Sequence, residues 1–463
     1  MLFCGMALAQ TPSPGPAPSS STPNSRRVIL DPRSFGFDLP PGEVRRGENA
    51  RVVTSDVDGA AVVAKVHAYV GKNCVVLLPD GQLVPRRESE VTPTERPFVA
   101  IDEDKLSERL TSGDFKGFKV KKSKNYLFLY TCSEKFAFGT SSILESMLPG
   151  VQKYAEAQKI DTHDPEVPLV VIMFRTEDEF QRYRRMPDGV VAYYHTVSNR
   201  VLMFEQSRLL ETRPDIAIQQ AISTIAHEGT HQILHNIGVQ QRLSQWPMWI
   251  SEGIAEFFAP TSFTKRLTWK GPAQVNDLRM FELEQYLKSK GAAEPNGDTV
   301  KHTVLAGRLT STGYATAWSL THFLATKKKA EFNRYVNEIS KVAPFEGAIE
   351  MQPPGVVPGN LTTFEKYFGN DYVDLETKLV QHLKKLPYND PFSEMPHFVA
   401  MFSYTEGKKP KREVSTFHSP AMANRWLQEM KQKNESSPSE PSIREFPNRA
   451  TAEAFARVWL RGG

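Results

Sequence analysis

Two histidines and a glutamate stand close together in the segment TIAHEGTHQILHN, residues 224–236. His227 and His231 are four positions apart, so on a helix both imidazoles can reach one ion at the Zn–N distance of about 2.0 to 2.1 Å. Glu228 then lies beside the metal without having to ligate it, where it can take a proton from water. The spacing favours a metal site of the H-E-x-x-H type over the alternative, a polar and solvated helix face.

A second segment, QWPMWISEGIAEFFAP (residues 245–260), supplies carboxylates. Two histidines leave zinc short of its third protein ligand, and catalytic zinc sites commonly use two histidines, one glutamate and a water. Pro247 can start a short helix and Pro260 lies just past its end, which puts Glu252 and Glu256 one turn apart on the same face. We expect Glu252 to be the third ligand and Glu256 to accept the free ring N–H of a ligating histidine.

The histidines need a helix, and we predict one over residues 213–237. Thr212 can serve as its N-cap with Asp215 three residues on, Pro214 suits the first turn, and Gly238 can close the C-terminus. At 100° per residue, an apolar stripe and a stripe of imidazoles fall on opposite sides of this helix. The apolar stripe is Ile218, Ile222, Ile225, Gly229 and Ile233, and the other is Thr224, His227, His231 and His235.

These segments also carry a family resemblance. AHEGTHQILHN followed by PMWISEGIAEFF resembles the bacterial domain-of-unknown-function family 1570, a group similar to gluzincin-type metallopeptidases, and GYATAWSLTHFL (residues 313–324) is similar to its later helix. The resemblance covers most of residues 118–390 and implies a zincin-like metallopeptidase domain with Glu228 as the general base. It does not supply a substrate. The ligands that it implies for Zn2+ are His227, His231 and Glu252.

Two choices within this site stay open. His235, one turn beyond His231, is an alternative ligand, although such a histidine more often packs or supports another side chain. Hydrolysis also creates an oxyanion that needs a hydrogen-bond donor. Tyr314 resembles the tyrosine that related gluzincins direct at that oxygen, and Tyr193 and Tyr194 are its rivals on a predicted hairpin joined by Ser198-Asn199.

The flanking regions are predicted to form smaller modules. Residues 45–100 contain short β-branched runs broken at Gly71-Lys72-Asn73 and Asp80-Gly81, which indicates hairpins and a small β-barrel. This region resembles the SH3-like module of the SLA1-homology type, and a purely structural role is as compatible with it as peptide binding. Residues 395–463 repeat the pattern F-x-x-x-A-x-A-x-x-aromatic at FHSPAMANRW and FPNRATAEAF, which indicates a small α/β module of two strand–helix units.

The N-terminal residues suggest export. MLFCGMALAQ is a short apolar run ending in small residues, and a Pro/Ser-rich stretch follows it. We interpret residues 1–26 as a truncated signal peptide and a flexible linker, against the alternative of an apolar N-terminus without function. No later segment has the roughly 18 uncharged apolar residues that a membrane span needs.

Composition excludes some classes of function. The 463 residues carry 57 basic and 53 acidic side chains, a balance that argues against nucleic acid as a partner. Cys74 and Cys132 are too few for a disulfide framework, although one bridge between them stays open.

The sequence therefore predicts an α+β protein, exported to the periplasm, cell envelope or extracellular space, that hydrolyses a protein or peptide substrate with zinc. The alternative is a catalytically silent cell-envelope binding or scaffold protein with a structural zinc site. Glu228 favours the enzyme, because a structural site has no use for a general base beside its histidines.

Overall fold

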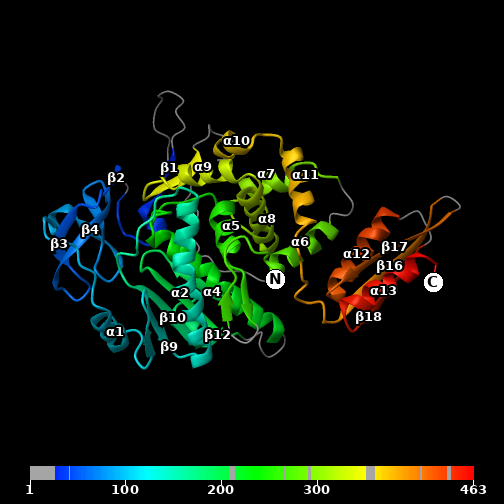
Figure 1. The fold of residues 1–463 in the computed structure, drawn as a ribbon, viewed down its shortest axis with the longest axis horizontal. Helices are drawn as coiled ribbons and strands as arrows, with labels where there is room; N and C mark the ends of the chain where they lie inside the picture. The colour runs from blue at the N-terminus through cyan, green and yellow to red at the C-terminus, as the bar shows by residue number, and fades with distance from the viewer. Residues whose placement is uncertain are drawn as a thin grey trace. The chain divides into compact units, whose positions relative to one another are not determined.

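The computed structural model divides into two compact units, one formed by Met1–Gln274 with Asn296–Leu383 and the other by Val275–Pro295 with Lys384–Gly463. Helices and sheets are mixed in both units, which confirms the predicted α+β class (Figure 1). Residues 1–26, on which the prediction of export depends, lie outside the described residues. The structure describes residues 27–40, 42–207, 214–263, 267–289, 294–350, 360–406, 409–434 and 439–462.

The N-terminal part of the first unit is an antiparallel sheet with strand order β6-β5-β4-β3-β7, and β2 pairs with β4. Its turns lie where the sequence predicted them, with Gly71 and Gly81 at positive φ of 59° and 86°. The sheet does not form a closed barrel, because β6 and β7 end it without pairing with each other within the described residues. The strands are β2 (Val44–Arg46), β3 (Arg51–Ser55), β4 (Ala61–Val70), β5 (Asn73–Leu77), β6 (Leu83–Arg87) and β7 (Thr92–Pro93).

One face of this open sheet is buried against the rest of the first unit. Val75 and Leu83 share an apolar cluster with Leu243 and Phe345, which come from far along the chain. The short strand β1 (Arg27–Ile29) likewise pairs with β15 (Glu346–Glu350). The N-terminal sheet thus contacts the rest of the first unit on one face, and a second cluster, which includes Val66 and Val76, contains only residues of its own region.

A mixed five-stranded sheet follows, with strand order β11-β12-β10-β9-β8. The three inner strands are parallel and each edge strand is antiparallel to its neighbour. The predicted hairpin at Ser198-Asn199 joins β11 to β12, and Asn199 adopts the left-handed conformation, φ 59°. The strands are β8 (Lys119–Lys122), β9 (Tyr126–Tyr130), β10 (Leu169–Thr176), β11 (Ala192–His195) and β12 (Arg200–Gln206).

The two edges of the mixed sheet are protected differently. Strand β8 has the sequence KVKK, and lysines discourage pairing with another chain. Strand β11 is covered, with Ala192 and Tyr193 only 0% and 2% exposed.

Helices cover both faces of the mixed sheet. Helices α2 (Glu134–Ala157) and α4 (Pro214–Asn236) pack against each other on one face (Figure 1). The other face packs against α1 (Glu103–Ser112) and α3 (Glu177–Tyr183). The remaining elements of the first unit are α5 (Met248–Phe258), β13 (Thr261–Phe263), β14 (Leu267–Trp269), α7 (Asp298–Leu305), α8 (Ser311–Lys327), α9 (Lys329–Ile339), α10 (Leu361–Phe368) and α11 (Tyr372–Leu383).

Buried amides fasten α4 to the hairpin. Asn199 and Asn236 exchange two hydrogen bonds, with Nδ2–Oδ1 distances of 2.8 and 2.7 Å. Gln232 Nε2 donates to the main-chain oxygens of Val170 and Asn199. Because a buried amide is costly when unpaired, these bonds hold the helix in one register against the sheet.

The second unit is a three-stranded antiparallel sheet with β16 in the centre and β17 and β18 on either side. Each sequence repeat starts at the end of an outer strand and runs into a helix. Helix α12 packs on one face of the sheet and α13 on the other. The elements are β16 (His397–Glu406), β17 (Lys409–Phe417), α12 (Pro420–Lys433), β18 (Ser439–Phe446) and α13 (Arg449–Leu460).

Helix α6 (Asp277–Ser289) belongs to this second unit, although the sequence placed it within the domain of residues 118–390. Arg449 Nη2 lies 2.6 Å from Glu284 Oε1, and the rings of Phe281 and Phe392 are 4.6 Å apart. These contacts join segments that are distant in sequence, so local pattern does not reveal them.

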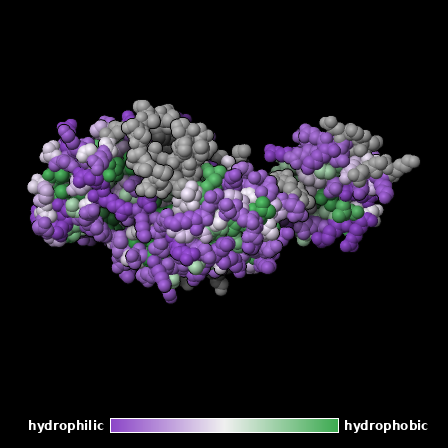
Figure 2. All heavy atoms as spheres, turned by 90° about the horizontal axis from the view of Figure 1, so that it is seen from above, coloured by the Kyte–Doolittle hydropathy of each residue, from purple (hydrophilic) through white to green (hydrophobic). Residues whose placement is uncertain are grey.

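Among the described residues, no helix is long and apolar enough to cross a membrane. The face drawn in Figure 2 is mostly hydrophilic, with hydrophobic residues in small separate groups. Cys74 and Cys132 are buried and free, so they form no bridge.

Candidate metal centre

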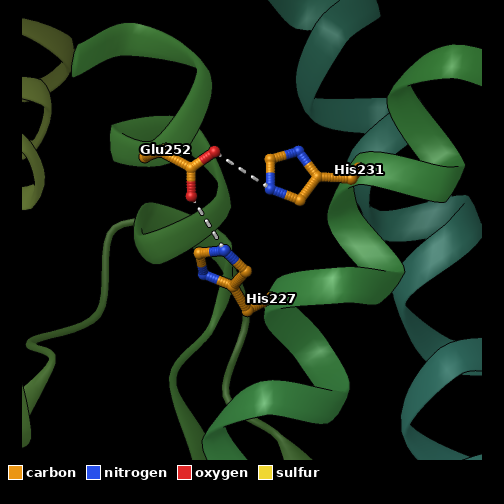
Figure 3. Close-up of side chains that lie close together, drawn as sticks. All are labelled: His227, His231 and Glu252. Atoms are coloured by element: carbon orange, nitrogen blue, oxygen red, sulfur yellow. Dashed lines mark hydrogen bonds and ion pairs between the residues drawn. The ribbon is translucent and has the colours of Figure 1, made fainter. Parts of the chain in front are cut away.

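His227 and His231 on α4 face Glu252 on α5, as Figure 3 shows. The Nε2 atom of His227 lies 3.2 Å from Glu252 Oε2, and that of His231 lies 3.5 Å from Glu252 Oε1. Both helices begin and end close to the predicted positions: α4 runs from Pro214 to Asn236, and α5 follows Pro247. The predicted cap Thr212 lies outside the described residues.

The spacing of these three side chains fits one metal ion. Ligand atoms about 2.0 to 2.1 Å from a tetrahedral ion are about 3.3 Å from one another. One ligand atom from each of the three side chains lies within 4.8 Å of the other two, close enough for a small inward shift to bring all three onto one ion. The group of His227, His231 and Glu252 can therefore hold a metal ion, as predicted.

Glu252 is suited to ligation because it stays ionised although it has no exposed surface. Burial by itself would raise the pKa of this carboxyl, but the positive charge of His231 and hydrogen bonds from both imidazoles outweigh it and lower the pKa to about 2. A carboxylate in this state can ligate a cation once both imidazoles are neutral.

Glu256 stands behind His227, where the sequence placed it. Its Oε1 atom lies 3.0 Å from His227 Nδ1, on the side of the ring away from Glu252, and both side chains are only 3% exposed. A carboxylate in this position fixes the tautomer in which Nε2 faces the metal.

Gly253 allows α5 to approach α8 beside Glu252. A Cβ atom at this position would lie 2.7 Å from the main-chain oxygen of Ala317 and 2.1 Å from Thr321 Oγ1. Any larger residue would push the two helices apart and carry Glu252 with them.

Glu228 lies next to the ligand group and is held by the hairpin. The main-chain N–H of Tyr194 on β11 donates to Glu228 Oε2 at 2.8 Å. Glu228 is 3% exposed, and this burial raises the pKa of its carboxyl to about 6. A carboxyl whose pKa is near neutrality can both accept and release a proton.

The structure separates the three tyrosines. The ring of Tyr314 on α8 lies 6.2 Å from that of His227, so it borders the centre. The hydroxyl of Tyr194 donates to Asn199 Oδ1 at 2.9 Å, and Tyr193 packs in the core of the opposite face of the sheet. His235 stacks on Tyr194 and is not one of the grouped ligand residues.

Sequence analysis missed the main-chain contact between Tyr194 and Glu228 and the amides that support it. Asn199 and Asn236 are ordinary turn and helix-end residues in the sequence, and only their pairing gives them a role. The one sequence signal for this arrangement was the turn pair Ser198-Asn199. Asparagine tolerates the left-handed conformation that Asn199 adopts here.

Residues 221–346 match the sequence model of a family described as a protein of unknown function (DUF1570). This match is shorter than the resemblance expected from the motifs, but it contains Glu228, Tyr314 and all three grouped ligands. A comparison with curated proteins returned no match.

Purified protein is expected to carry about one zinc ion per chain. Elemental mass spectrometry of the His227→Ala, His231→Ala double variant should find almost no metal, because two of three ligands are gone. The His163→Ala, His302→Ala double variant is the control, since both of these histidines are exposed. Stoichiometric zinc in the first variant would place the ion elsewhere.

Replacing Glu256 should weaken metal binding without abolishing it. We expect Glu256→Gln to raise the Kd for zinc by about 10- to 100-fold, because an amide oxygen accepts the His227 N–H less strongly. Competition with a chromophoric chelator measures this. Glu376→Gln, a buried carboxylate bonded to Thr299 on α7, should leave the Kd unchanged. Equal affinities for both variants would contradict the role of Glu256.

Proposed function

We propose that this chain is an exported, zinc-dependent peptidase with a zincin-like domain. The observation that carries the proposal is the position of Glu228, a buried carboxylate beside a group of two histidines and one glutamate, with one oxygen fixed by a main-chain N–H. A general base needs this combination of proximity and orientation. The resemblance of residues 45–100 to SLA1-homology modules stays a prediction.

The donor set supports zinc. Two imidazoles and one carboxylate suit this borderline ion, and three protein ligands leave one position for water in catalytic sites. When bound, zinc supplies Lewis acidity that polarises a carbonyl group and makes water more acidic. Among the described residues, the group contains three ligands and not four.

Glu228 then moves the proton. Its Oε2 atom accepts the Tyr194 N–H, and we assign the proton taken from water to Oε1. The same carboxyl afterwards gives this proton to the leaving amine, so the base of the first step is the acid of the second. We assign the hydrogen bond to the developing oxyanion to Tyr314, and the position of its ring beside His227 supports this assignment.

One observation favours the second candidate function, a catalytically silent cell-envelope binding or scaffold protein. The side chains of His227, His231 and Glu252 are only 3%, 10% and 0% exposed, and buried ligands are typical of structural metal sites. A substrate would have to reach the centre from the side of His231, its most exposed ligand. Activity measurements separate the two functions.

Glu228→Gln is expected to keep zinc and thermal stability while losing about 10²- to 10⁴-fold in the rate of casein hydrolysis, because an amide cannot take up the proton. Glu252→Gln should instead lose zinc, since an amide is a poorer ligand than a carboxylate. Metal content, melting temperature and casein cleavage are measured side by side. Equal rates of casein hydrolysis for wild type and Glu228→Gln would remove Glu228 from the mechanism. If zinc-loaded wild type cleaves no peptide of a peptide library, the binding-protein function is favoured.

Tyr314→Phe removes one hydroxyl and should lower kcat by about 10²-fold with zinc content unchanged, because one oxyanion donor is lost. Tyr193→Phe is the matched control, since that side chain lies on the far face of the sheet. Steady-state kinetics on a fluorogenic peptide give both values. A larger loss of kcat for Tyr193→Phe than for Tyr314→Phe would show that Tyr314 is not the donor to the oxyanion.

A further inference from the structure

Arg242, in the loop that follows α4, binds the turn of the β11–β12 hairpin. Its Nε and Nη2 atoms donate to the main-chain oxygen of Thr196, and Nη2 also donates to that of Val197. Nη1 donates to the main-chain oxygen of Gly81, in the turn between β5 and β6. We call these four residues the hairpin anchor.

The hairpin anchor buries a charge whose hydrogen-bond acceptors are neutral. Arg242 is 6% exposed, and its acceptors are all main-chain oxygens at the turns of two different sheets. A buried guanidinium is tolerated only when its donors are satisfied. The planar fork of arginine can reach several oxygens in fixed directions at once, which a lysine cannot do.

Further bonds join the N-terminal sheet to the same place. The main-chain N–H of Leu83 on β6 donates to Val197 at 2.8 Å, and His67 Nε2 on β4 lies 2.8 Å from the main-chain oxygen of Arg242. The hairpin turn is thus held from two sides, by the loop that continues α4 and by the N-terminal sheet.

This turn begins two residues after Tyr194, the strand residue whose N–H holds Glu228. Strand β11 ends at His195, and Tyr194 before it donates its N–H to Glu228 Oε2. A shift of the hairpin relative to α4 would therefore break that bond before it disturbed any ligand of the metal centre.

We propose that the hairpin anchor sets the position of the Tyr194 N–H against Glu228. Arg242 is then a positioning residue, and the N-terminal sheet is part of the framework of the metal centre. The effect on catalysis rests on the proposed function, whereas the mechanical link to Tyr194 does not.

Hydrogen exchange tests the mechanical link in the full-length protein. We expect exchange of the Tyr194 amide to be at least about 10-fold faster in Arg242→Met than in wild type, because the turn loses its restraint. Arg86→Met is the matched control: Arg86 also bonds to main-chain oxygens in the N-terminal sheet, but not to the hairpin. Its Tyr194 amide should exchange as in wild type. An unchanged Tyr194 amide in folded Arg242→Met would overturn the proposal.

Arg242→Lys serves where the methionine variant does not fold. The lysine keeps the charge but cannot bind the main-chain oxygens of Thr196, Val197 and Gly81 together. The Tyr194 amide should therefore exchange faster in this variant than in wild type. Equal exchange rates would again overturn the proposal.

Kinetics test the catalytic part separately. Arg242→Lys should lower kcat by about 10-fold with KM within about twofold, and should cost nothing further in the Glu228→Gln background. An equal loss in both backgrounds would show that Arg242 does not act through Glu228. Absence of hydrolysis by wild type would contradict only the proposed function. The hydrogen-exchange measurement would still test whether Arg242 positions the Tyr194 N–H.

Discussion

The carboxylate of Glu252 is buried between two imidazoles where α5 meets α4, and the neighbouring elements are arranged around it. A buried charge must be compensated by partners with opposite charge or by hydrogen bonds. Glu228 and Glu256 add two more buried carboxyls at the same crossing. Because these side chains meet only in the folded chain, we infer that a bound cation would add its binding energy to the stability of this unit.

Contacts spread outward from this crossing in two directions. On one side, Gly253 lets α8 pack against α5 and brings Tyr314 to the border of the centre. On the other, Glu228 is linked through Tyr194 to the hairpin, and the hairpin through Arg242 to the N-terminal sheet. The candidate metal centre therefore depends on segments from separate parts of the first unit.

The ligand group could be predicted from the sequence because its geometry is local. The spacing of His227 and His231 follows from the helical repeat, and prolines mark both ends of the helix that carries Glu252. The third ligand needed only one assumption, that the two helices meet.

The remaining differences arise from long-range packing. Alternating apolar residues in β4 to β6 indicate strands, but they do not tell whether a sheet closes into a barrel or packs on another core. Segments that are distant in sequence meet where β11 is buried, where Asn199 pairs with Asn236 and where Arg242 makes its contacts. No local pattern distinguishes these residues from ordinary turn or surface residues.

The place of α6 has a consequence for biosynthesis. Its partners in the second unit, among them Phe392 and Arg449, lie more than a hundred positions later in the chain. At about 5 to 20 residues per second, a ribosome needs several seconds or more to make them. During that time Phe281 on α6, which is 5% exposed in the finished fold, lacks its native partner Phe392. The nascent chain thus has an interval in which a chaperone or a second nascent chain can bind this helix.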